Sequence, residues 1–113
     1  MQLTVTDAGE NVARVALQGR LDTPGVDAVE TRLTAMLVPA GRSAIVDLSG
    51  VEFAGSMAIR MFLSIAKALA RKGRALVLYA PQPAVAELFE TVSLGDVLPI
   101  ATDEAKALAR LSP

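Results

Sequence analysis

The sequence has 113 residues, a 52% share of hydrophobic residues and a formal net charge of −1. A chain of this length forms one domain and buries roughly two thirds of the surface that its unfolded form exposes, and its apolar content excludes a disordered chain. The absence of cysteine and histidine excludes disulfides, the usual zinc sites and a serine or cysteine nucleophile activated by histidine. We therefore expect a single domain over residues 1–113, without enzyme activity, cofactor or metal site.

Charge and aromatic content also bear on partners and location. Lysine and arginine are dispersed along the chain, which holds three phenylalanines, one tyrosine and no tryptophan. Nucleic-acid binding would therefore have neither a basic footprint nor stacking platforms. No apolar run approaches the roughly 20 residues that cross a bilayer, and the first residues alternate like a strand, unlike a signal peptide. We expect no nucleic-acid partner, no membrane segment and a cytoplasmic location.

The first part of the chain predicts a hairpin followed by a helix. Residues 2–6 alternate between polar and apolar side chains, as do residues 12–19, and a turn-forming segment, 7–11, separates them. This pattern predicts two antiparallel strands. Thr23 is then expected to cap a helix that has Pro24 in its first turn. The apolar positions of this helix recur at helical spacing and predict a face that lies on a sheet: Val26, Val29, Leu33, Met36 and Leu37.

The middle of the chain predicts a central strand and a long helix. The apolar run Ala44–Leu48 indicates a strand covered on both faces, and a helical pattern follows from Ser56 to about Lys72. Its core-facing positions are Ala58, Phe62, Ile65, Ala66 and Leu69, and its polar stripe is Arg60, Ser64, Lys67 and Arg71. Met57 and Met61 fall beside the stripe, close to Ser56. Methionine suits both core filling and adaptable partner contacts, so both interpretations stay open.

The last part of the chain completes an α/β fold. We expect a buried strand over Ala75–Tyr79. A short strand over Val97–Ile100 is expected at the edge of the sheet, because it contains proline. Thr102 is expected to cap a final helix. A short helix between these strands is expected to turn Val85, Leu88, Phe89 and Val92 inward. The predicted order is β-β-α-β-α-β-α-β-α, a mixed sheet with helices packed on it. Sites in such sheets gather beyond the carboxyl ends of strands, which is expected to bring Asp22 and Ser56 together.

Four segments taken together resemble a STAS domain, and most of all the stand-alone anti-anti-sigma factors of bacteria. These segments are Gly19–Asp22, Ile45–Val51, Phe53–Ile59 and Pro81–Val85. The likeness runs from Leu3 to about Ile100 and preserves the order of elements. It implies a STAS fold and an anti-sigma factor antagonist in a partner-switching pathway. It also implies as partner an anti-sigma factor with a GHKL-type serine kinase domain, with a serine phosphatase that reverses the modification.

Ser56 matches the phosphoacceptor at the start of the family's second helix, and Asp22 matches the family's nearby aspartate. The family's motif is typically Asp-Ser-Ser-Gly or Asp-Ser-Thr-Gly, whereas the same positions here read Gly55-Ser56-Met57-Ala58. The acidic residue, the second hydroxyl and the glycine are therefore missing. The expected partner-binding residues are Asp22, Thr23, Gly55, Ser56, Met57, Arg60 and Met61.

Other interpretations of the same residues stay open. Ser56 as a plain helix cap and Asp22 as a turn or capping carboxylate are structural roles that such residues commonly have. The stripe of Arg60, Lys67 and Arg71 suits a solvated helix face or, alternatively, a recognition surface. The alternative function is a non-phosphorylated scaffolding STAS subunit of a transporter or of a larger signalling complex.

Overall fold

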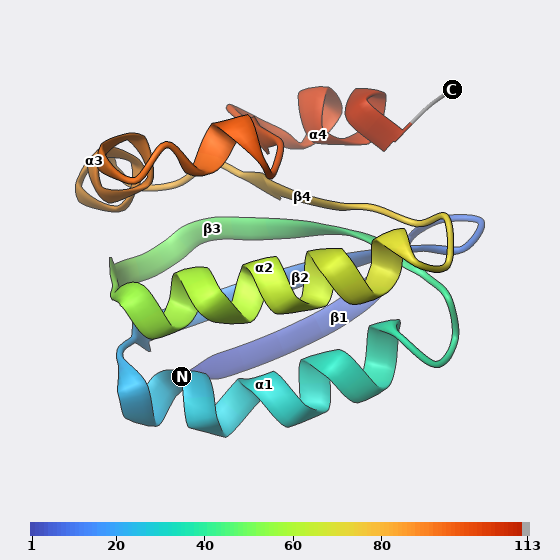
Figure 1. The fold of residues 1–113 in the computed structure, drawn as a ribbon, viewed down its shortest axis with the longest axis horizontal. Coiled ribbons are helices and arrows are strands. Elements are labelled where there is room, and N and C mark those ends of the chain that lie inside the picture. Colours follow the sequence, from blue (N-terminus) through green and yellow to red (C-terminus); the bar gives the residue numbers. More distant parts are fainter. Residues whose placement is uncertain (112–113) are drawn as a thin grey trace.

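The computed structural model describes residues 1–111 as a five-stranded mixed sheet with four α-helices and one 3-10 helix, η1 (Figure 1). The elements in chain order are β1 (Gln2–Gly9), β2 (Val12–Leu21), α1 (Thr23–Leu37), β3 (Ser43–Ala54), α2 (Ser56–Ala70), β4 (Leu76–Tyr79), α3 (Pro83–Thr91), η1 (Leu94–Asp96), β5 (Ile100–Ala101) and α4 (Glu104–Leu111). The sheet order is β1-β2-β3-β4-β5, with β1 antiparallel to β2 and all other neighbours parallel. The predicted order of strands and helices is confirmed, with η1 added before β5.

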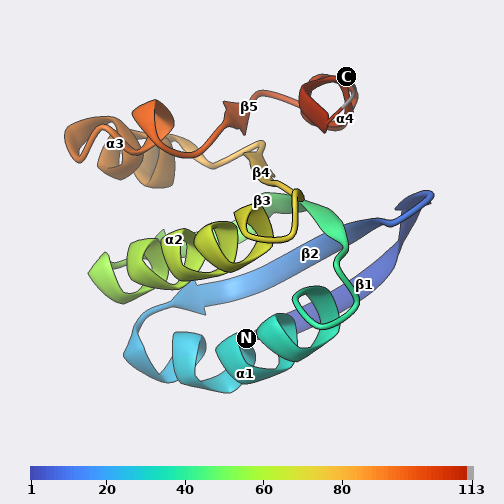
Figure 2. The ribbon, with the colours of Figure 1, turned by 45° about the vertical axis from the view of Figure 1, so that its right-hand side comes forward.

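Helices α1, α2 and α3 connect the parallel strands and lie on one face of the sheet. Because the strand order follows the sequence order, connections of one hand place all three helices on the same side. Their buried side chains belong to one apolar cluster, which they share with inward residues of β2, β3 and β4. Figure 2 shows α1 and α2 side by side, with α4 on the other side of the sheet. Among residues 1–111, no helix is both long enough and apolar enough to span a membrane.

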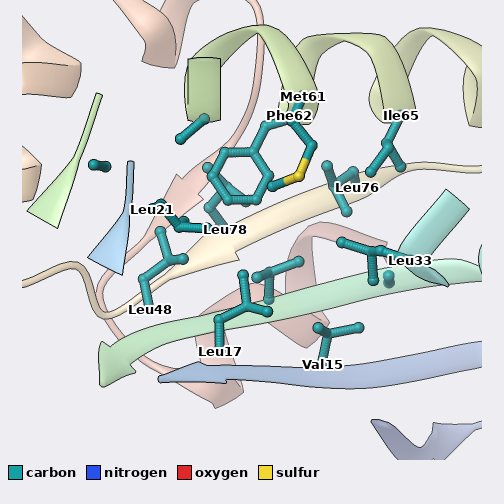
Figure 3. Packing of buried hydrophobic residues seen from close by; sticks show 14 of the residues in the cluster. Val15, Leu17, Leu21, Leu33, Leu48, Met61, Phe62, Ile65, Leu76 and Leu78 are labelled. Carbon is teal, nitrogen blue, oxygen red and sulfur yellow. The ribbon is translucent and has the colours of Figure 1, made fainter. Parts of the chain in front are cut away.

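The inward face of α2 is anchored in the main core. Figure 3 shows Met61, Phe62 and Ile65 directed from α2 toward the sheet, and each is at most 2% exposed. Burying one large apolar side chain stabilises a fold by about 1.5–3 kcal/mol. Several such side chains along one stripe therefore fix α2 on the sheet, and with it the position of its first turn.

The opposite face of the sheet is partly covered by α4. Ala107 of α4 packs against Ile45 of β3 and Tyr79 of β4. Glu104, in the first turn of α4, accepts hydrogen bonds from the Arg14 guanidinium on β2 and from the Tyr79 hydroxyl. Burial raises the pKa of Tyr79 to about 12. These contacts cover β3 on both faces, as its apolar sequence predicted.

Some side chains predicted to face inward are exposed. Met36 of α1 and Val92, which follows α3, are 42% and 48% exposed. Both stand at the margin of a helical stripe, where the helix surface already turns away from the sheet. Ala66 and Leu88 stand at similar margins and are half-buried.

Element boundaries also differ from the predictions. Of the strand predicted over residues 97–100, only Ile100 belongs to β5, which continues to Ala101. Pro99 has no N–H to pair, although its carbonyl accepts from the N–H of Leu78 at 3.0 Å. The cap of α4 is Asp103 rather than Thr102, since the Asp103 carboxylate accepts from the N–H of Lys106 at 2.8 Å. The predicted central strand is longer than the apolar run, because β3 continues to Ala54.

Candidate functional site

The carboxyl ends of β2 and β3 lie side by side, and a helix begins directly after each. The last residues of the two strands, Leu21 and Ala54, are paired in the sheet. The N–H of Gly55 then donates to the carbonyl of Leu21 at 3.1 Å. Backbone pairing that reaches the ends of both strands therefore sets the separation between the starts of α1 and α2.

The start of α1 is closed by a side chain. Asp22 is the N-cap, and its Oδ1 accepts from the N–H of Gly25 at 2.9 Å. The prediction that Thr23 caps this helix is wrong, because Thr23 already occupies the first helical position. A Cβ on Gly25 would lie 1.9 Å from the carbonyl oxygen of Arg20. Only glycine therefore lets the first turn approach β2 this closely, which places the Asp22 carboxylate.

The start of α2 is open. Ser56 is the first helical residue and is exposed, and the N-cap Gly55 is extended, with φ −108° and ψ −173° and no capping side chain. The carbonyl of Gly55 accepts from the N–H groups of Ala58 and Ile59 at 3.1 and 3.4 Å. The N–H groups of Ser56 and Met57 lie in the first turn of the helix and therefore have no carbonyl acceptor within it. Their partial positive charge therefore lies at the surface, beside the serine hydroxyl.

A shallow hollow of about 240 Å³ lies between the two helix starts. It is lined by Leu21, Asp22, Thr23, Phe53, Gly55, Ser56 and Met57. Five of the seven predicted site residues thus meet in one place, and Asp22 and Ser56 lie close together, as expected from the topology. Asp22 both caps α1 and lines this hollow.

The two remaining predicted residues lie elsewhere. Arg60 is exposed on the next turn of α2, where its Nη1 lies 3.9 Å from the Met57 sulfur. Met61 is 1% exposed and packs in the core (Figure 3). Its prediction as a partner contact is wrong, because it lies on the same α2 face as Phe62 and Ile65 and points toward the sheet.

Two residues of this region, Phe53 and Arg20, were not predicted. Phe53 is 40% exposed, and the Arg20 guanidinium lies over its ring, 4.6 Å from the centroid. Such stacking contributes about 0.5–1 kcal/mol at exposed positions. The pairing of β2 with β3 shifts at this point, so that Gly19 pairs with Val51 and Arg20 with Phe53. Strict alternation from Val51 would turn Phe53 inward, and nothing in the local sequence marks the shift.

Asp22 is the only charged residue that lines the hollow. The Asp22 carboxylate is matched by Arg20, whose Nε lies 3.6 Å away. Helix α2 itself contains no Asp or Glu, and Arg60 stands one turn from Ser56. The open N–H groups and this arginine therefore meet no carboxylate of their own helix, and a negative group on Ser56 would be stabilised there.

The family model of the STAS domain matches residues 5–107 of the chain. The chain belongs to the STAS domain family. The candidate anti-sigma factor antagonist BtrV of Bordetella bronchiseptica is 28% identical to this STAS domain over 109 residues, which cover 96% of this chain and 93% of BtrV.

Solved structures share the fold of this STAS domain. An anti-sigma factor antagonist from Mycobacterium paratuberculosis has a TM-score of 0.86 at 22% identity, with 97% of this chain and 92% of that chain covered. The Bacillus cell fate determinant SpoIIAA in its phosphorylated form has a TM-score of 0.72 at 18% identity, with 98% and 100% covered. The α/β STAS fold that the sequence predicted is confirmed.

Proposed function

We propose that this STAS domain is an anti-sigma factor antagonist that binds an anti-sigma factor carrying a GHKL-type serine kinase domain, and that phosphorylation of Ser56 abolishes this binding. The observation that carries the proposal is the exposed Ser56 hydroxyl on the first residue of α2, at a helix start that no side chain caps. The resemblance to BtrV over nearly its whole length supports the antagonist role. The phosphorylated form of SpoIIAA supports the modification.

The fold of the domain tolerates a phosphate at this position. Phosphorylation adds about −1.5 to −2 charges at neutral pH. The open N–H groups of the first turn and the helix dipole stabilise such an anion. The hydroxyl is exposed and α2 is held by the core on its other face, so modification requires no rearrangement.

The same phosphate changes what a partner meets. A partner surface that fits a neutral hydroxyl and the half-buried Met57 would face a new double charge at the contact. Like-charge or unpaired burial at an interface costs several kcal/mol, which corresponds to a loss of affinity of about a hundredfold or more. A serine phosphatase restores the neutral surface. The switch thus acts on binding and leaves stability nearly constant.

The first experiment measures binding of the anti-sigma factor that co-purifies with the chain from its native cell. Ser56→Asp is expected to weaken binding about a hundredfold, with the free energy of unfolding changed by less than about 1 kcal/mol. Thr31→Asp is the matched control, because it places the same charge on the exposed side of α1. Equal affinities of Ser56→Asp and wild type would disprove the switch.

A second experiment separates the antagonist from a scaffolding subunit of a transporter or larger complex. The latter is favoured by Gly55 and Ala58, which replace the acidic residue and the glycine of the family's usual motif. Incubation with the partner kinase and ATP is expected to add one phosphate, about 80 Da, to wild type and none to Ser56→Ala. An unmodified wild-type chain in a stable complex would support the scaffold.

A further inference from the structure

The acidic residues of this chain are unevenly distributed along the sequence. Residues 53–86 contain no Asp or Glu, although the chain as a whole has twelve acidic residues and a net charge of −1. The same stretch carries five of the eleven cations. They are Arg60, Lys67, Arg71, Lys72 and Arg74. Helix α2 and the turn after it therefore form a local positive region on a nearly neutral molecule.

An apolar groove runs along this positive region. Its lining residues come from α2 and from Val97 in the connection from η1 to β5, and it has a volume of about 650 Å³. Leu63, Ala66 and Ala70 of α2 line it together with Val97. Val97 is 70% exposed, although it is an aliphatic side chain next to other apolar groups. Water therefore covers an apolar strip that a binding partner would bury.

The polar lining of the groove consists of two cations and the neutral Ser64. Arg60 and Lys67 line it, and neither forms an ion pair with a carboxylate of residues 1–111. No Asp or Glu lines the groove. Asp96 precedes Val97 but lines a separate hollow with Glu90. Charge complementarity thus requires a partner that brings carboxylates of its own.

We propose that this groove binds an amphipathic helix of a partner protein whose polar face is acidic. The groove extends from Arg60 to Ala70, about 15 Å along α2, which matches about three turns of a bound helix. Apolar residues of that helix would cover the apolar strip, and its carboxylates would reach Arg60 and Lys67. The groove shares no lining residue with the hollow at Ser56. It is a second surface on α2, one turn away from Ser56 at its nearest residue, Arg60.

Two synthetic helical peptides of about three turns test the proposal. They share one Leu/Ala face, and their polar faces carry Glu in one peptide and Lys in the other. Each is titrated into ¹⁵N-labelled full chain and followed by amide chemical shifts. The Glu peptide is expected to shift the amides that line the groove and to bind at least tenfold more tightly than the Lys peptide. Equal binding of both peptides, or shifts confined to other surfaces, would overturn the proposal.

Variants of the full chain locate the contact. Lys67→Glu is expected to lower the affinity for the Glu peptide at least tenfold. Lys106 is an exposed cation of α4, and Lys106→Glu is expected to leave this affinity unchanged. Val97→Ser is expected to weaken both peptides severalfold, with the dispersion of the spectrum confirming that each variant is folded. Equal effects of Lys67→Glu and Lys106→Glu would refute the assignment.

Two further measurements separate this proposal from others. Ser56→Ala, which removes the phosphoacceptor without adding a charge beside Arg60, is expected to leave peptide binding within twofold of wild type. Peptide binding can therefore be absent while the Ser56 switch holds, and the reverse. Sedimentation velocity of the free chain is expected to show a monomer. A dimer that Val97→Ser dissolves would assign the groove to a second copy and contradict the proposal.

Discussion

The starts of α1 and α2 are neighbours at one edge of the sheet, yet they are built in opposite ways. In α1 the Asp22 carboxylate accepts from the N–H of Gly25, and the first turn presses against the backbone of β2. In α2 the cap is Gly55, which has no side chain, and the first N–H groups stay open beside Ser56. Helix α4 is closed by Asp103 in the manner of α1.

The difference separates a helix start that stabilises the fold from one that is open to a ligand. A closed helix start supplies its own negative group and gains stability from it. An open start leaves that position for a group that arrives later, such as a phosphate. The comparison can be tested by variants that introduce a steric clash, remove a capping side chain or add one at these two helix starts.

Crowding the start of α1 is expected to have the largest effect. Gly25→Ala would place a Cβ 1.9 Å from the Arg20 carbonyl oxygen, and the backbone would have to move, at a cost of about 3 kcal/mol. Urea denaturation measures the change. Gly95→Ala is the control, because a Cβ there meets no atom within 4 Å. Similar losses for both variants would show that the tight contact is unimportant.

Removing the hydroxyl or carboxylate from each start is expected to give unequal effects. Asp22→Ala loses the cap of α1 and is expected to lower the free energy of unfolding by about 1 kcal/mol. Ser56→Ala loses no capping bond and is expected to stay within about 0.5 kcal/mol of wild type. Asp22→Asn, which keeps an accepting oxygen without the charge, separates the cap from electrostatics. If Ser56→Ala cost as much as Asp22→Ala, the start of α2 would not be open.

Closing the start of α2 is expected to have the smallest effect. Gly55→Asp gives α2 the kind of cap that α1 has, and a Cβ there makes only an ordinary contact, 3.5 Å from Phe53. Replacing a glycine cap by aspartate is worth a few tenths of a kcal/mol, so a gain of about 0.5 kcal/mol is expected in thermal unfolding. A loss of stability would mean that the first turn is not accessible to a carboxylate.

The sequence predicted the order of elements and most of the core because both follow from hydrophobic periodicity. Periodicity predicts which face of a helix a residue occupies, but it does not predict where the buried part of that face ends. Periodicity therefore predicts that Met36 is buried, although it is exposed, and it does not decide between core and surface for Met61, which is buried. These limits depend on how far each helix is covered by its neighbours, which is a tertiary property.

The sequence predicts which residues meet at the candidate site better than it predicts their exposure and contacts. Asp22 and Ser56 meet because parallel strands end at the same edge, and topology alone predicts this. The exposure of Phe53 depends on a shift in pairing between β2 and β3, which local sequence does not reveal. The cations are dispersed along the sequence, but those of residues 53–86 have no acidic residue near them in the sequence. Their concentration on one surface becomes apparent only when α2 and Val97 are seen together.

The hydrogen bond from Gly55 to Leu21 joins main-chain atoms alone. Its geometry is therefore indifferent to which side chains surround the serine, and Gly55-Ser56-Met57-Ala58 can differ from relatives without displacing the hydroxyl. Residues 55–58 can therefore change in sequence while the fold of the domain is conserved. Under the proposed function, a new pairing of regulator and kinase would need only a few substitutions in this exposed stretch, and the fold would stay the same.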